Sequence, residues 1–151
     1  MKEFLFSAIH RHFEETRPLL HQLTDKLIQS SSPVQGGRSL GEIWLHLIRS
    51  MEYYLRGVSE GKWEVLPYAL EKYSSEQAIF NLYDNVAMRC KSYMAKLQFV
   101  DLSEEILRFN RPATKMEILL ELIEHSVQHR GQILVYYRIL GIGPVKIPYV
   151  I

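Results

Sequence analysis

The chain has 151 residues, a length typical of one domain around a single hydrophobic core, and we expect one domain over residues 1–151. Its formal net charge is +1 and its basic residues are dispersed, which argues against a nucleic-acid partner. The apolar stretches are too short to span a bilayer and the N-terminal segment lacks the pattern of a signal peptide, so we expect a cytoplasmic protein with no membrane partner.

A first helical pattern covers residues 2–29, where apolar residues recur at helical spacing. Pro18 lies inside this pattern and cannot donate a backbone hydrogen bond, so we expect a kink or a break at residues 14–17. The polar stretch QSSSPVQGGR, residues 29–38, then predicts a loop.

A second helix is predicted to begin at Ser39. In the sequence SLGE, the Ser39 hydroxyl can accept a hydrogen bond from the first helical turn while Glu42 reaches back to the Ser39 amide, an arrangement called a capping box. Gly57 and Gly61 indicate the end of this helix. Residues 59–73 predict mostly loop, with room for one short helical turn.

The third helix has the same start signal in SSEQ, with Ser74 as the cap and Gln77 at the third helical position. Its apolar stripe includes Cys90, the one cysteine of the chain, so an internal disulfide is excluded. We interpret Cys90 as a small buried hydrophobic residue rather than as a reactive thiol.

Residues 98–112 form a connection that is either a short helix or an extended segment, and the pattern leaves both open. A third capping box, from Thr114 to Glu117, starts a fourth helix that continues to about Leu140 and ends at Gly141. No segment alternates between apolar and polar residues over a sustained length. The sequence therefore predicts an all-α fold, most simply an up-and-down four-helix bundle.

Two histidines of the fourth helix, His125 and His129, lie four residues apart and therefore share one helical face. That face also carries Ile118 and Leu122, so it is otherwise built for burial. Burying two imidazoles without hydrogen-bond partners is unfavourable. A divalent metal would remove this penalty, because each neutral imidazole offers a lone pair to such an ion.

A third histidine, His46, lies on an inward-facing part of the second helix, between Ile43 and Ser50. Facing helices of a bundle can bring such side chains together in the core. Three histidines on one ion leave a coordination position open, which is typical of catalytic rather than structural metal sites. The alternative is that all three are ordinary core residues that hold no metal.

The other titratable candidates are weaker. His10 and His21 fall beside the apolar stripe of the first helix, and we predict that both are at the surface. His12 falls on the stripe, which favours a satisfied core histidine over a fourth ligand or a group that orients a ligand. Glu121 lies one turn before the histidine pair and could orient an imidazole, or could simply begin the polar side of the helix.

Four further residues are candidates for lining a pocket at the site, because they continue the faces that carry the histidines. For each of them, packing with a satisfied polar tip is an equally good interpretation. These residues are Ser50, Tyr53, Gln132 and Tyr136.

Two segments closely resemble the DinB family of DinB/YfiT-like metalloproteins: SLGEIWLHLIRSMEYYLRGV, residues 39–58, and LIEHSVQHRGQILVYYRILGIGP, residues 122–144. The family pattern is one histidine on the second helix and an HxxxH pair followed by RGQ on the fourth. The resemblance covers nearly the whole chain. It implies a four-helix bundle, usually dimeric, in which a divalent metal, commonly zinc or nickel, is held by His46, His125 and His129.

Some members of that family resemble transferases that add bacillithiol, mycothiol or a related thiol to a small electrophile. The resemblance therefore implies a metal-dependent thiol S-transferase with a small-molecule substrate, and the thiol would come from a cosubstrate because Cys90 is expected to be buried. One alternative is a hydrolase that uses metal-bound water, with Glu121 as the nearby candidate base. Another is a non-enzymatic, stress-related metal-binding protein. Gln128 stands where many members carry a histidine, but it points away from the shared face.

Overall fold

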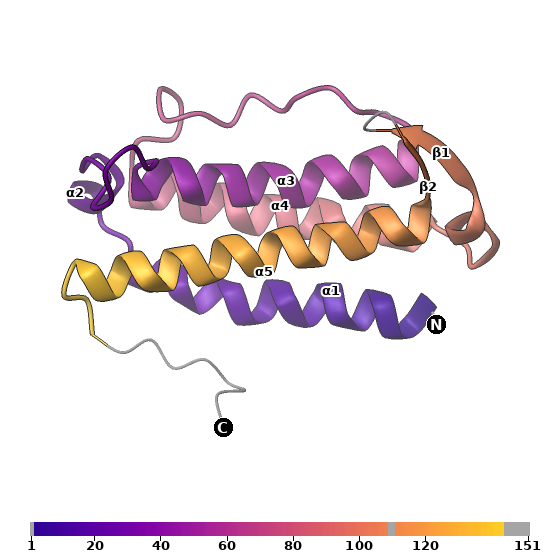
Figure 1. The fold of residues 1–151 in the computed structure, drawn as a ribbon, viewed down its shortest axis with the longest axis horizontal. Helices are drawn as coiled ribbons and strands as arrows, with labels where there is room; N and C mark the ends of the chain where they lie inside the picture. Colours follow the sequence, from indigo (N-terminus) through magenta and orange to yellow (C-terminus); the bar gives the residue numbers. More distant parts are fainter. Residues whose placement is uncertain (1, 109–110, 144–151) are drawn as a thin grey trace.

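The computed structural model describes residues 2–108 and 111–143, and most of them are helical (Figure 1). The long helices are α1 (Lys2–Thr16), α3 (Leu40–Glu60), α4 (Glu76–Lys96) and α5 (Lys115–Ile139). The shorter elements are the 3-10 helix η1 (Arg17–Gln22), the helix α2 (Asp25–Ile28), the 3-10 helix η2 (Val100–Ser103), and the strands β1 (Glu105–Arg108) and β2 (Arg111–Thr114). The two strands form an antiparallel hairpin at one end of the bundle. The mostly helical fold that the sequence predicts is confirmed.

Helices α3 and α4 run in the same direction. Cys90 of α4 lies against the Met51 carbonyl in the middle of α3, and Lys96 at the end of α4 pairs with Glu60 at the end of α3. A simple up-and-down connection would reverse the direction between these two helices. Here the loop of residues 61–75, called the strap below, runs back along the bundle before α4 begins (Figure 1).

Two of the three predicted capping boxes are confirmed. The Ser39 hydroxyl accepts a hydrogen bond from the Glu42 amide and the Glu42 carboxylate accepts one from the Ser39 amide, and Thr114 and Glu117 are arranged in the same way. Each pair satisfies two amides that a helix start would otherwise leave without partners. Gly61, with φ 69°, ends α3 in the left-handed conformation that favours glycine.

The predicted cap of α4 is wrong by one residue. Ser75, rather than Ser74, accepts a hydrogen bond from the amide of Ala78. The Gln77 amide group donates instead to Asn81 in the next turn. Two consecutive serines offer the same local signal, so the pattern could not choose between them.

The segments after Pro18 and after α4 depart from regular α-helix. The first α-helix ends at Thr16 and continues as the tighter η1, as the position of Pro18 predicts. The connection over residues 98–112 contains both a short 3-10 helix and part of the hairpin, so neither alternative describes it alone. Within the described residues, none of the helices combines the length and the apolar character that crossing a membrane requires.

A buried carboxylate ties the strap to the bundle. Glu52 of α3 is 3% exposed and accepts hydrogen bonds from Arg89 of α4 at 2.7 and 2.8 Å. It also accepts one from the hydroxyl group of Tyr68, a strap residue, at 2.5 Å. Because a buried carboxylate requires paired partners, this cluster holds the middle of the strap against α3.

A second contact holds the strap near its start. The Trp63 ring covers the bare backbone at Gly57, where an added Cβ would lie 2.3 Å from the ring. The same ring lies edge-on to Tyr53, with ring centroids 5.4 Å apart. The glycine therefore allows a close approach that no other residue would permit.

We expect Gly57→Ala to lower the free energy of unfolding by roughly 1–3 kcal/mol, because the new methyl group overpacks against Trp63. Gly131→Ala is the matched control. Gly131 is also inside a helix, but a Cβ there meets nothing within 4 Å, so this change should stabilise by about 0.5–1 kcal/mol. Urea unfolding followed by circular dichroism measures both values. Equal changes in the free energy of unfolding for the two variants would contradict the close contact between Gly57 and Trp63.

Candidate metal centre

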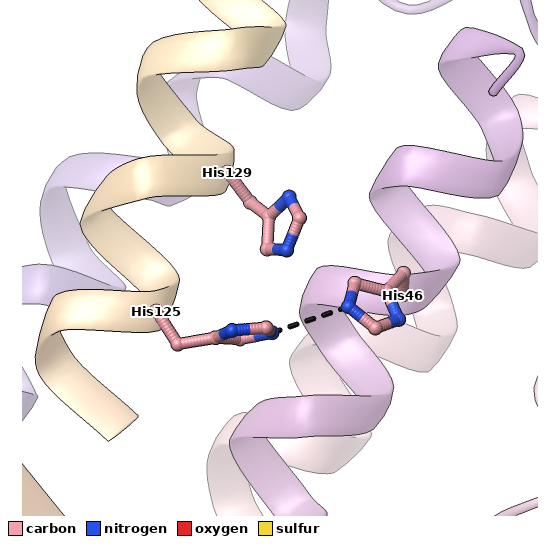
Figure 2. Close-up of side chains that lie close together, drawn as sticks. All are labelled: His46, His125 and His129. Carbon is pink, nitrogen blue, oxygen red and sulfur yellow. Dashed lines mark hydrogen bonds between the residues drawn. The ribbon is translucent and has the colours of Figure 1, made fainter. Parts of the chain in front are cut away.

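Three histidines from two helices point toward one another (Figure 2). His46 lies on α3, and His125 and His129 lie one turn apart on α5. One ring nitrogen from each lies within 4.8 Å of the other two, and the ring centroids are 4.5–5.1 Å apart. The structure therefore brings together the three histidines that the sequence singles out, and they could hold a metal ion.

The spacing of the nitrogens suits a divalent ion. Nε2 of His46 and Nε2 of His125 are 3.2 Å apart. Two imidazole nitrogens on one tetrahedral zinc, with bonds of about 2.0–2.1 Å, lie roughly 3.3 Å from each other. A set of imidazole donors suits zinc, nickel and other first-row ions and does not select among them.

Polar neighbours orient two of the rings. Nδ1 of His129 donates to Oε1 of Gln132 at 3.1 Å, which leaves the lone pair of the neutral ring on Nε2. An acceptor on the far nitrogen is the usual support for a metal-binding histidine. Nε2 of His125 lies 3.1 Å from the hydroxyl oxygen of Ser50, which itself donates to the His46 carbonyl at 2.8 Å.

His46 has a neighbour that donates a hydrogen bond rather than accepting one. Nη2 of Arg49, one turn along α3, lies 3.1 Å from Nδ1 of His46. A guanidinium group only donates hydrogen bonds, so in this contact Nδ1 of His46 accepts and the hydrogen of the neutral ring is on Nε2.

Burial keeps the three imidazoles neutral. It is the largest cause that lowers the pKa of His46 to about 4, and it also lowers the pKa values of His125 and His129. The positive charge of Arg38 lowers all three pKa values further, whereas the hydrogen bond to Gln132 opposes the shift in His129. At neutral pH the rings therefore present lone pairs, the form that binds a metal.

The predicted pocket-lining residues lie at different distances from the imidazoles. Ser50 and Gln132 contact them directly, as described above. Tyr53 packs edge-on against Tyr54. Tyr54, which was not predicted, lies near His125 with ring centroids 6.1 Å apart. Tyr136 is 3% exposed, and its hydroxyl group lies 3.2 Å from that of Ser32. That these four residues line a substrate pocket stays a prediction.

A cavity of about 230 Å³ opens beside His46. Its walls come from Arg38, from the first turns of α3 including Arg49, and from strap residues 68–71. Neither arginine was predicted as a site residue. The spacing of Arg49, three residues after His46, was a visible signal, whereas the place of Arg38 depends on how the preceding loop folds.

The remaining histidines lie apart from this cluster. His12 is 4% exposed on α1, and within the described part of the chain its Nδ1 has no hydrogen-bond partner. Its predicted burial is confirmed, but the expectation that its polar atoms are satisfied is wrong at Nδ1, and His12 is not a member of the histidine cluster. His10 and His21 are exposed, as predicted.

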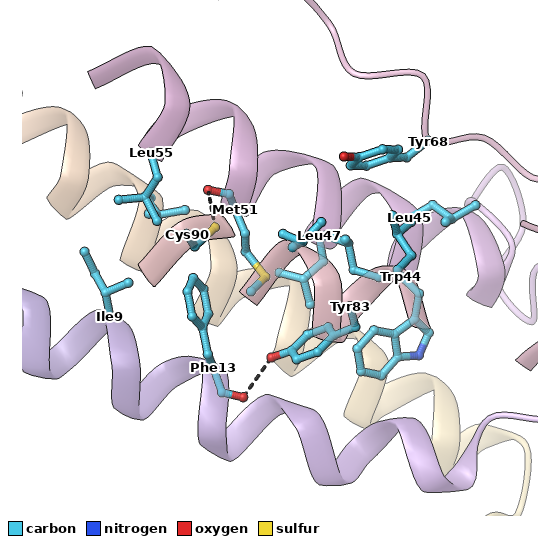
Figure 3. Close-up of a cluster of buried hydrophobic side chains, with 14 of the residues drawn as sticks. Ile9, Phe13, Trp44, Leu45, Leu47, Met51, Leu55, Tyr68, Tyr83 and Cys90 are labelled. Atoms are coloured by element: carbon cyan, nitrogen blue, oxygen red, sulfur yellow. Dashed lines mark hydrogen bonds between the residues drawn. The ribbon is translucent and has the colours of Figure 1, made fainter. Parts of the chain in front are cut away.

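Two other candidate residues have different surroundings. Glu121 pairs with Arg111 of the hairpin, which fits its interpretation as the start of the polar side of the helix. Cys90 is fully buried, and its thiol donates weakly to the Met51 carbonyl at 3.8 Å (Figure 3). Burial raises the pKa of the Cys90 thiol well above its usual value. The predicted structural role of Cys90 is confirmed.

Comparison with known families decides the relationship. The model of the DinB family matches residues 1–151. The chain belongs to the DinB family. An uncharacterized protein of Bacillus subtilis, YjoA, is 24% identical to this DinB chain over 141 residues, which cover 89% of the chain and 90% of that protein.

Solved structures of DinB-like proteins have the same fold. One from Bacillus cereus is 25% identical, with a TM-score of 0.77 over 99% of this chain and 97% of the other. The structure of YjoA from Bacillus subtilis is 21% identical, with a TM-score of 0.77 over 96% and 95% of the two chains. The second likeness supports the fold alone. Together with the family match, these structures confirm the predicted DinB-like four-helix bundle.

We expect His12 to make this DinB protein sensitive to acid. Burial, and then the positive charge of Arg130, lowers the pKa of His12 to about 3. The unfolded chain takes up the proton near its ordinary pKa of 6.5, so stability falls as the pH drops from 6.5 toward 3. Glu15 and Arg11 line the same groove.

We expect the wild-type free energy of unfolding to fall relative to that of His12→Leu by up to about 1.4 kcal/mol per pH unit below pH 6. Urea unfolding at several pH values from 4 to 7 measures the difference. The exposed variant His10→Leu serves as the control and should follow the wild-type slope. Parallel curves for wild type and His12→Leu would contradict the neutral, buried state of His12.

Proposed function

We propose that the protein binds a divalent metal, zinc or nickel, through His46, His125 and His129. The observation that carries this proposal is the approach of three neutral imidazole nitrogens to within 4.8 Å of one another. The hydrogen bond from His129 to Gln132 supports it, since it directs a lone pair toward the other two rings. Membership of the DinB family agrees with it.

We further propose that the protein is a thiol S-transferase that acts on small electrophiles. When bound, a divalent ion lowers the pKa of a coordinated thiol and so supplies a nucleophile near neutral pH. The chain itself offers no equivalent group at Cys90, whose thiol is buried and kept protonated. The sulfur nucleophile would therefore come from a low-molecular-weight thiol such as bacillithiol.

The roles of the surrounding residues follow from their contacts. Gln132 and Ser50 hold two of the imidazole rings in place. The cavity beside His46 provides room for a small molecule next to the ion. A hydrolase that uses bound water is less well supported, because its candidate base, Glu121, is paired with Arg111.

Metal content tests the first part of the proposal. We expect about one divalent ion per chain in wild-type protein purified without an affinity tag or chelator, as for a three-histidine zinc site. His46→Ala and His129→Ala should each lose the ion, while the exposed control His21→Ala should keep it. Elemental analysis measures the content, and circular dichroism checks that each variant is folded. Wild-type protein that takes up neither zinc nor nickel would refute the site.

Thiol dependence tests the second part. We expect the zinc- or nickel-loaded protein to consume a small electrophile only when a low-molecular-weight thiol is added, with loss of this reaction in His129→Ala. Cys90→Ser should retain it, because the Cys90 thiol is buried away from solvent. Turnover without thiol would favour the hydrolase instead. Loaded protein with no turnover would favour the non-enzymatic, metal-binding alternative.

The DinB resemblance also implies a homodimer, which we retain as a proposal. Light scattering coupled to size-exclusion chromatography measures the mass of the assembly in solution. A mass equal to that of one chain at micromolar concentration would contradict it.

A further inference from the structure

Two histidines of the cluster have a polar residue three positions later on their own helix, with opposite hydrogen-bonding character. Gln132 accepts from Nδ1 of His129 at 3.1 Å, and Arg49 donates to Nδ1 of His46 at 3.1 Å. The first contact leaves the lone pair of His129 on Nε2. The contact with Arg49 places the lone pair of His46 on Nδ1 and the ring hydrogen on Nε2.

A metal bound to Nε2 of His46 therefore requires Arg49 to leave Nδ1. A neutral imidazole that ligates through Nε2 carries its one hydrogen on Nδ1. That hydrogen would face a guanidinium group that also only donates, so the contact would become repulsive. The two states of His46, bound to Arg49 or bound to a metal, exclude each other.

The cavity beside His46 is the neighbouring space that can receive this guanidinium. Arg49 and Arg38 both line it. Arg38 is also close enough to the cluster for its charge to lower the pKa values of all three imidazoles. Two guanidinium groups beside one small cavity are the usual means by which a protein recognises a carboxylate.

The acidic residues at the cavity do not remove this attraction. Glu42 is held at the start of α3, where its Oε2 accepts a hydrogen bond from the Ser39 amide at 2.7 Å. Glu71 of the strap is exposed, and its charge would oppose the binding of an anion. Removing the charge of Glu71 should therefore strengthen anion binding, whereas removing the charge of either arginine should weaken it.

We propose that the cavity binds a carboxylate-bearing small molecule through Arg38 and Arg49, and that this carboxylate and the metal bind cooperatively because both draw Arg49 away from His46. The inference rests on the proposed metal site and names the chemical class of its substrate or cosubstrate. By linkage, the metal tightens carboxylate binding by the same factor by which the carboxylate tightens metal binding.

Calorimetric titration of succinate into the zinc-loaded protein tests the cavity. We expect Arg38→Gln and Arg49→Gln each to weaken succinate binding about tenfold or more, as expected when a charge-assisted hydrogen bond is lost. Glu71→Gln should tighten it. Arg11→Gln, which removes one positive charge on α1 away from this cavity, is the matched control and should bind as wild type does.

Zinc affinity, measured by competition with a chromophoric chelator, tests the coupling. In wild type, succinate should tighten zinc binding, while neutral succinamide should not. Arg49→Gln should bind zinc more tightly without any succinate, because glutamine can accept from His46 as Gln132 does from His129. Succinate should then tighten zinc binding less in this variant than in wild type, through no more than the attraction between its charge and the ion.

Three results would overturn the proposal. The first is that wild-type protein does not bind succinate at millimolar concentration, and the second is that it binds succinate no more tightly than the two arginine variants do. Coupling that is as large in Arg49→Gln as in wild type would show that Arg49 does not carry it. These failures can be told apart from failure of the proposed function. If the arginine variants bind succinate as wild type does while the protein still holds its full complement of zinc, the carboxylate site is refuted and the metal site stands. Conversely, wild type without zinc would refute the metal site, and the succinate titration of the same protein would still test Arg38 and Arg49.

Discussion

The register between α3 and α5 depends on the hydroxyl group of Tyr137. It accepts a hydrogen bond from the indole of Trp44 at 3.2 Å and donates one to the Leu19 carbonyl at 2.8 Å, inside the core. A slip of α5 along α3 would leave these buried groups without partners, at a cost of about 1–3 kcal/mol each. Trp44 lies two residues before His46, and Tyr137 lies about two turns after His129. The contact that joins the helices therefore also holds the imidazoles opposite each other.

How much the sequence could predict depended on how local each feature is. That His125 and His129 share a face follows from helical periodicity alone, and the caps at Ser39 and Thr114 follow from residues within one turn. The position of His46 opposite the pair depends on the packing of two helices far apart in the chain. Periodicity showed only that His46 faces inward, and it was the family resemblance that assigned His46 to the same site as His125 and His129. The place of Arg38 depends on a loop whose path has no local pattern.

The positive charge near the histidine cluster has two opposite effects on metal binding. The charge of Arg38, the contact with Arg49 and the burial of the rings all disfavour a proton on the imidazoles. The same positive charges also disfavour a divalent cation at the same place. Lone pairs are thus available at neutral pH, but the nearby positive charge must be offset before a cation is held well. An anion beside the ion would provide that offset, so the charge of a ligand matters as much as its shape.

The strap shapes the cavity without setting the register of the helices. Its residues 68–71 form one wall of the cavity, yet the register of the helices is held by contacts among α3, α4 and α5. The strap is attached where Trp63 covers Gly57, where Arg56 binds Glu64 and where Tyr68 binds Glu52. Insertions or substitutions after Tyr68 could therefore enlarge, narrow or recharge this wall while the histidines stay in place. Related proteins with the same bundle could acquire different ligands through this segment alone, so divergence of specificity should be sought there first.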